Sequence, residues 1–122
     1  MKIAFCLKEN RPDSPLDERF GRASWFALVD AQEGKVLEIV ENTAQMESAG
    51  AGSLAVQILL DHGAETIIAP EFGPISHEAL KTFKVELFKQ GAHRTIDSAL
   101  KAWEEGTLEK AEKAGAKGLH KA

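Results

Sequence analysis

The sequence predicts an α/β fold with a five-stranded mixed sheet and helices on both faces of that sheet. Two observations support this fold class. The first half of the chain contains three short runs rich in β-branched and aromatic residues, and the second half alternates such runs with segments of helical periodicity. The order of elements is therefore βββαβαβα. With right-handed crossovers, only the second strand runs against the other four.

The first half supplies three strands and one long loop. In residues 2–8 every second side chain is large and apolar, which is the period of a strand. Residues 9–23 contain two prolines and mostly polar side chains, so we expect a long loop there. The runs 24–30 and 35–41 are joined by a short segment that contains glycine, which predicts an antiparallel hairpin.

The second half alternates helices with strands. After a second glycine-containing loop, apolar residues recur at three- and four-residue spacing from Leu54 to His62. Proline suits a first helical turn, and threonine suits an N-cap. We therefore predict, in order, a helix that Gly63 ends, a strand at 66–70, a helix from Pro74 to Phe83, a strand at 85–89 and a helix from Thr95 to Trp103.

Length and composition indicate one domain. The chain has 122 residues, 43% hydrophobic and 28% charged, and a net charge of −4 that argues against general binding to nucleic acids or anionic membranes. We expect residues 1–108 to form the domain and residues 109–122 a tail, because Leu108 and Leu119 are the only large apolar residues from Glu104 onward. That tail is expected to be a frayed, solvated helix or disordered.

The cysteine content and the lengths of the apolar runs predict a cytoplasmic protein. A single cysteine, Cys6, excludes an internal disulfide and suits a reducing compartment. The apolar run at the N-terminus is too short for a signal peptide, and no run approaches the ~20 residues that a membrane helix needs.

Four loops are predicted to meet at one edge of the sheet. Because four strands share a direction, the loops that follow them leave from the same side. These loops contain residues 19–22, 46–53, 71–74 and 90–94. Ligands of open α/β sheets usually bind in the crevice beyond the carboxyl ends of the strands, so this rim is the predicted binding site.

Arginines and glycines make the rim a candidate anion site. Arg19 and Arg22 flank a glycine turn and can hold an anion through forked hydrogen bonds, or can pair with acidic residues of their own loop. Phe20 between them is expected to plug the core beneath the loop. Glycines at two helix starts let backbone N–H groups approach an anion, or make plain turns. The candidate binding residues are Arg19, Phe20, Gly21, Arg22, Gly50, Gly52, Ser53 and Gly73.

Soft and nitrogen donors near the rim are candidate metal ligands. They are Cys6, Met46, His77 and His93. Each has a plainer interpretation, as a buried inert thiol, a hydrophobic lid, or a packing or surface histidine. No nucleophile elbow, P-loop or HExxH motif is present, so we predict no catalytic residues and no enzyme.

The order of elements resembles a ribonuclease H-like three-layer architecture. In nucleases of that architecture, carboxylates on the strands hold metal ions. The first strand here carries none, which argues against two-metal hydrolysis.

Several motifs together resemble the dinitrogenase iron-molybdenum cofactor biosynthesis family, the small domain of nitrogenase cofactor carriers and accessory proteins. The resemblance covers residues 1 to about 108. The matching segments are the opening strand MKIAFCL, SPLDERFGRA at 14–23, the run from Trp25 to Asp30, AGAG at 49–52, GAETII at 63–68, Gly73-Pro74 and the closing helix from Thr95.

The resemblance implies a ribonuclease H-like fold without nuclease activity and the non-covalent carriage of an iron-sulfur or iron-molybdenum cofactor or its precursor. Family members that carry the cofactor commonly have histidine directly before the Phe-Gly pair, where this chain has Arg19. Arginine stays protonated and does not coordinate iron in the ordinary way, but it can attract an anionic cluster by charge.

The leading hypothesis is a small non-catalytic protein that holds an anionic metallocluster at the sheet rim and exchanges it with cluster donor or acceptor proteins. The alternative is a protein-interaction or regulatory module that binds a partner or an anionic metabolite without metal. An enzyme that acts on a phosphorylated small molecule is a third reading. We expect a monomer or a weak homodimer, since the third or fifth strand can leave an exposed edge.

Overall fold

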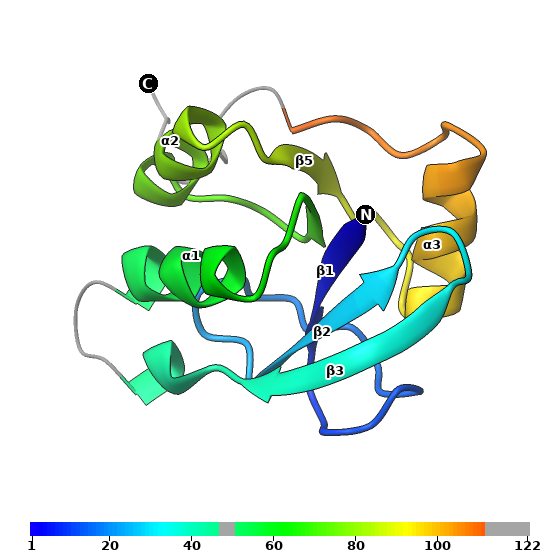
Figure 1. Ribbon diagram of the computed structural model, residues 1–122, viewed down its shortest axis with the longest axis horizontal. Coiled ribbons are helices and arrows are strands. Elements are labelled where there is room, and N and C mark those ends of the chain that lie inside the picture. Colours follow the sequence, from blue (N-terminus) through cyan, green and yellow to red (C-terminus); the bar gives the residue numbers. More distant parts are fainter. Residues whose placement is uncertain (47–50, 112–122) are drawn as a thin grey trace.

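The computed structural model describes residues 1–46 and 51–111 and has two helices on one face of the sheet and one on the other (Figure 1). Its elements are β1 (Lys2–Leu7), β2 (Trp25–Asp30), β3 (Lys35–Glu41), the short 3-10 helix η1 (Thr43–Met46), α1 (Ala51–Asp61), β4 (Thr66–Ala69), α2 (Pro74–Thr82), β5 (Glu86–Lys89) and α3 (Ile96–Glu104). The predicted order of strands and α-helices is confirmed. The 3-10 helix was not predicted.

The five strands form one mixed sheet in the order β3-β2-β1-β4-β5. β2 pairs antiparallel with both β1 and β3, whereas β4 pairs parallel with both β1 and β5. Only β2 therefore runs against the others, as predicted, and four strands end at the same edge. The finer assignment to a ribonuclease H-like fold stays a prediction.

The central strand β1 is buried on both faces, which explains its apolar composition. Ala4 and Cys6 pack in the core beneath α1 and α2, and the alternate residues Ile3, Phe5 and Leu7 pack in the core beneath α3. All five are fully buried. A strand covered on both faces must bury consecutive residues, so two cores sandwich the sheet.

The start of α3 and its buried face follow from local sequence. The Thr95 side chain accepts a hydrogen bond from the backbone N–H of Ser98 at 3.2 Å, which caps the start of α3. Ile96, Ala99 and Leu100 are buried on its inner face.

No helix in residues 1–46 and 51–111 is long and apolar enough to cross a membrane.

The prediction for the end of the chain was wrong for residues 107–111. A solvated helix was expected beyond Glu104, but the chain turns and runs along β5, whose open edge it covers (Figure 1, orange). Lys89 N–H donates to the Glu109 carbonyl at 2.8 Å, and Ala111 N–H donates to the Leu87 carbonyl at 2.8 Å. Because this pairing uses backbone groups, it leaves no side-chain pattern in the sequence from which it could be predicted. Residues 112–122 lie outside the described part of the chain, and the domain boundary at 108 stays a prediction.

Candidate functional site: an arginine-lined hollow at the sheet rim

Three of the four predicted rim segments line one hollow of about 490 Å³. It lies beyond the carboxyl ends of β1 and β4, between the loop after β1, the first turn of α1, and the loop that leads into α2. We call it the arginine hollow. Its lining residues are Glu18, Arg19, Phe20, Gly21, Arg22, Gly52, Pro70, Glu71, Gly73 and Ser76.

Arg19 is held by the buried carboxylate of Asp17. Arg19 Nε lies 3.1 Å from Asp17 Oδ1, a terminal guanidinium nitrogen lies 3.2 Å from Oδ2, and the Arg19 backbone N–H also donates to Oδ1 at 3.0 Å. The Asp17 side chain is 3% exposed, whereas that of Arg19 is 60% exposed. These hydrogen bonds raise the pKa of Arg19 above its ordinary value, so its charge is permanent. Pairing within the loop therefore occurs, and it orients Arg19 at the hollow.

Asp17 also ties this loop to two other parts of the fold. Its backbone N–H donates to the Cys6 carbonyl at 2.7 Å, and its own carbonyl accepts from Gln90 Nε2 at 3.0 Å. The base of Arg19 is thus fixed to β1 and to the loop after β5. From the sequence, Asp17 was predicted only as a possible partner of the arginines, because its burial depends on these distant contacts.

Phe20 plugs the core, as expected. It is 6% exposed, and its ring centroid lies 5.3 Å from that of Phe72 and 6.0 Å from that of Phe26. Beside it, the fully buried Asn42 donates from Nδ2 to the carbonyls of Gly21 at 3.0 Å and Ala23 at 2.8 Å. The turn between the two arginines is therefore held from below by an aromatic cluster and an amide.

The starts of α1 and α2 touch at the floor of the hollow. A Cβ atom at Gly52 would lie 2.6 Å from Ser76 Oγ, so only glycine fits there without movement. Ser76 is 4% exposed and was not singled out from the sequence. Gly73 caps the start of α2 in extended conformation and lines the hollow. Ser53 is exposed and is not among the lining residues, and Gly50 lies outside the described residues.

The candidate metal ligands are not brought together. Cys6 is fully buried in the core, and burial, followed by the nearby Asp17 charge, raises the pKa of its thiol, which stays protonated. His77 donates from Nε2 to the Ala111 carbonyl at 2.9 Å, away from the hollow. His93 is hydrogen-bonded through Nδ1 to Ser98 Oγ and lines a different pocket. The Met46 side chain lies outside the described part.

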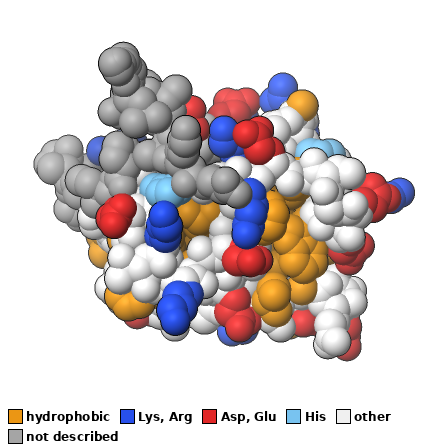
Figure 2. Space-filling model, turned by 90° about the horizontal axis from the view of Figure 1, so that it is seen from above, with side chains coloured by type: hydrophobic (Ala, Val, Ile, Leu, Met, Phe, Trp, Pro, Cys, Tyr) orange, Lys and Arg blue, Asp and Glu red, His pale blue; other side chains and the backbone are white. Residues whose placement is uncertain are grey.

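The lining of the hollow carries charges of both signs, because Glu18 and Glu71 lie there with Arg19 and Arg22. Acidic and basic side chains are interspersed on the face that Figure 2 shows. Among the described residues, no group of three or more His, Cys, Asp or Glu side chains could hold a metal ion. What the hollow offers is guanidinium charge, backbone at two helix starts and a serine hydroxyl.

These features define a small α/β domain with an arginine-lined hollow beyond the carboxyl ends of its parallel strands. Residues 1–106 match the family described as dinitrogenase iron-molybdenum cofactor, and the chain belongs to that family. It is 32% identical over 114 residues to an uncharacterised protein of Methanocaldococcus jannaschii, a match that covers 92% of each chain.

Two solved structures are similar in both sequence and fold. The apo form of the orange protein from Desulfovibrio gigas matches with a TM-score of 0.86 and 30% identity, covering 93% of this chain and 95% of that one. A NifB-like protein from Thermotoga matches with a TM-score of 0.78 and 32% identity, covering 93% of this chain and 96% of that one. The predicted family is therefore confirmed, while the roles of individual site residues stay predictions.

Proposed function

We propose that this protein is a non-catalytic carrier that holds an anionic iron-sulfur or iron-molybdenum cluster, or a precursor of one, in the arginine hollow. One observation carries the proposal: Arg19 and Arg22 line the same hollow as Gly52 and Gly73, which lie at the starts of α1 and α2. Guanidinium groups and the N–H groups of helix starts both favour anions. The family description supports a cofactor as the cargo.

The donor chemistry favours holding by charge and hydrogen bonds. The described residues provide no cluster of metal-ligating side chains, and the Cys6 thiol is buried away from solvent. A cluster whose terminal metal sites are filled by ligands of its own can be held by cations and N–H donors, whereas protein thiolates fill those sites in ordinary iron-sulfur proteins. The Glu18 and Glu71 carboxylates also line the hollow. Glu18 lies 3.3 Å from Arg94 and 3.9 Å from Lys8, which offset its charge.

Carriage of a cluster implies partner proteins that exchange it. A carrier takes its cluster from a donor protein and gives it to an acceptor, and we propose that both exchanges occur in the cytoplasm. A ribonuclease H-like sheet without nuclease carboxylates on β1 would serve as a rigid support for the loops.

A second candidate function is a regulatory module that binds an anionic metabolite or a protein partner without metal. The lack of clustered metal ligands among the described residues favours this alternative. In that case the same arginines would bind a metal-free anion such as pyrophosphate.

The test is anaerobic mixing with an iron-sulfur cluster donor, followed by desalting, metal analysis and visible absorption. We expect iron to stay with the protein, and Arg22→Gln to lose most of it. Arg19→Gln should have the same effect, with its folding checked by circular dichroism because it leaves the buried Asp17 carboxylate without its fork. Arg11→Gln is the matched control, since Arg11 pairs with Glu9 and Asp13 and does not line the hollow.

The outcomes separate the two functions. Iron no higher than background in the wild type would exclude metallocluster carriage. Calorimetric binding of pyrophosphate that needs Arg22 but not Arg11, without any iron retention, would support the metal-free alternative.

A further inference from the structure

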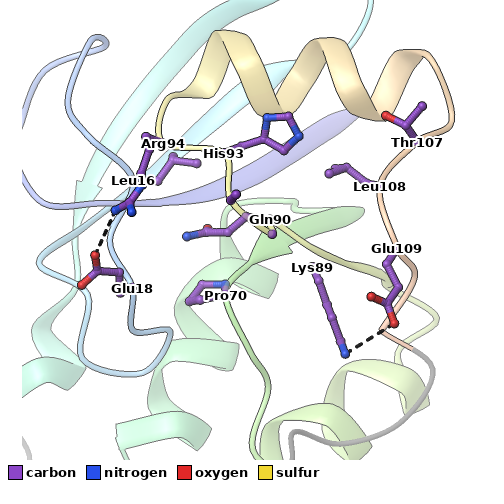
Figure 3. Close-up of a pocket in the computed structure, with 12 residues that line it drawn as sticks. Leu16, Glu18, Pro70, Lys89, Gln90, His93, Arg94, Thr107, Leu108 and Glu109 are labelled. Atoms are coloured by element: carbon purple, nitrogen blue, oxygen red, sulfur yellow. Dashed lines mark hydrogen bonds and ion pairs between the residues drawn. The ribbon is translucent and has the colours of Figure 1, made fainter.

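A second pocket lies beside the arginine hollow and has a different character. It has a volume of about 430 Å³ and lies beyond the carboxyl end of β5, between the loop 90–94 and the segment 107–109 (Figure 3). We call it the β5 pocket. Glu18 and Pro70 line both cavities and form the wall between them. The proposed carriage of a cluster does not use this pocket.

Gln90 in the pocket lining has an unpaired buried oxygen. The side chain is 4% exposed, and its Nε2 donates to the Asp17 carbonyl at 3.0 Å. Its Oε1 is buried and has no hydrogen-bond partner among the described residues. Exchanging the two amide atoms would place oxygen against the Asp17 carbonyl oxygen, which assigns the orientation of the amide in the empty pocket. Buried acceptors without a partner are rare and costly, which points to a donor that is bound only part of the time.

Two ion pairs lie on opposite sides of the pocket, with Gln90 between them (Figure 3). The Arg94 guanidinium lies 3.3 Å from the Glu18 carboxylate, and the Lys89 ammonium lies 3.6 Å from the Glu109 carboxylate. All four side chains are at least 40% exposed, so these pairs are weak and readily exchanged for a ligand. The formal charges cancel, so the pocket suits a ligand that carries both signs.

Apolar side chains line the space between the charged ends. Leu16, Pro70 and Leu108 provide this surface, and Leu108 comes from the segment that runs along β5. A volume of about 430 Å³ falls in the range of pockets that bind small molecules. The ligand should therefore be short, with charged ends and a body that has both apolar atoms and an N–H donor.

We propose that the β5 pocket binds a short zwitterionic peptide. Its carboxylate binds Arg94, its ammonium group binds Glu109, and its N–H donates to Gln90 Oε1. Because Oε1 is shielded in the empty pocket, the Gln90 amide turns about its soft terminal torsion when the ligand enters, and its Nε2 then gives up the hydrogen bond to the Asp17 carbonyl. The source is either free peptide or the chain end of a partner protein, since both carry the same groups.

The test is an NMR titration of the ¹⁵N-labelled protein with the dipeptide Ala-Ala. We expect saturable shifts of the Gln90 side-chain amide and of residues 91–94 and 107–109. Free alanine, which lacks the peptide N–H, should bind about tenfold more weakly, as should Ala-Ala capped by N-acetyl and C-amide groups. Ala-Ala capped only at its N-terminus mimics the C-terminal end of a protein, and its binding distinguishes a partner's chain end from a free peptide.

Variants separate a binding role of Gln90 from a structural one. Gln90→Met keeps the length of the side chain but removes both the acceptor and the Nε2 donor to the Asp17 carbonyl, and should weaken dipeptide binding about tenfold. Arg94→Gln leaves that hydrogen bond in place and should give a similar loss, which a purely structural role of Gln90 does not predict. Gln57→Met is the matched control, because Gln57 is exposed on α1 and pairs with Asp61. Should Gln90→Met fail to fold, Arg94→Gln tests the carboxylate contact instead, with a similar expected loss.

Two results would overturn the proposal: no saturable shift of the Gln90 amide with the dipeptide, or equal affinity in wild type, Gln90→Met and Arg94→Gln. Arg22→Gln should leave dipeptide binding unchanged. Failure of this proposal and failure of cluster carriage are thus observed in different variants and with different ligands.

Discussion

The contact between the starts of α1 and α2 makes a sharp prediction for Gly52→Ala. A Cβ at this position would lie 2.6 Å from Ser76 Oγ and 4.0 Å from Ser76 Cβ. The first distance is far inside van der Waals contact, and the second is an ordinary contact. The strain therefore comes from a single oxygen atom, which Ser76→Ala removes.

The two opposing effects can be estimated separately. Forcing extra volume into a packed site costs typically about 1–3 kcal/mol. Replacing glycine by alanine inside a helix gains about 1 kcal/mol. We expect Gly52→Ala alone to destabilise the protein by about 1 kcal/mol, and the same substitution in a Ser76→Ala background to stabilise it by up to about 1 kcal/mol. The coupling energy is then about 2 kcal/mol.

Urea unfolding of the four proteins of this cycle measures the coupling. Gly73→Ala is the matched control, because a Cβ there meets no atom within 4 Å, and its effect should be small and independent of Ser76. If Gly52→Ala has the same effect in both backgrounds, the close approach of Gly52 to Ser76 does not limit the site and the reasoning is refuted. The cycle also reports on the hollow, since both residues line it.

Two further predictions concern the start of α3 and the core. Thr95→Ala removes the side-chain acceptor for Ser98 N–H and should lower the free energy of unfolding by about 1 kcal/mol. Thr82→Ala, at the end of α2, should change it by less than about 0.5 kcal/mol. Equal effects of the two substitutions in urea unfolding would argue against the cap. The pKa of the buried Cys6 thiol is raised above its ordinary value of 9.0, so the folded state keeps a proton that the unfolded state loses as the pH rises past that value. Wild-type stability should therefore fall above about pH 9, by up to about 1.4 kcal/mol per pH unit relative to Cys6→Ala, and parallel pH profiles of the two proteins would contradict this.

Periodicity predicted the strands and helices because each element buries a face whose pattern is local. The alternation in residues 2–8 correctly placed Cys6 on the face opposite Ile3 and Phe5. The directions of the strands followed from connection rules, and these in turn predicted that the arginines and glycines of separate loops meet. The meeting of Arg19 with Gly52 and Gly73 in one hollow is observed.

The polar residues that hold the hollow were not predicted as buried. Asp17, Asn42 and Ser76 are each at most 4% exposed, yet nothing in their neighbourhood in the sequence marks them as buried. Asn42 donates to carbonyls of a distant segment, such as that of Gly21, and the Asp17 backbone N–H donates to the Cys6 carbonyl. Backbone groups are the same in every residue, so sequence carries no signal for these bonds.

The position of the segment 107–111 was also not predictable from the sequence, for the same reason. It pairs with β5 through backbone hydrogen bonds and carries only Leu108 as a large apolar residue. The position of His77 depends on it, because the imidazole donates to the Ala111 carbonyl. His77 was a candidate metal ligand only while that contact was unknown.

The sequence by itself determined the elements, the direction of the strands, the edge at which the loops meet and the family. Those properties follow from side-chain periodicity, turn residues and chain connectivity, which are all written along the chain. Only the tertiary structure decided that Asp17 orients Arg19, that the metal-donor candidates are dispersed, and that Gln90 at a second pocket has a buried oxygen without a partner among the described residues. These depend on burial and on backbone partners brought from far along the chain, and neither exists until the sheet and its helices have packed.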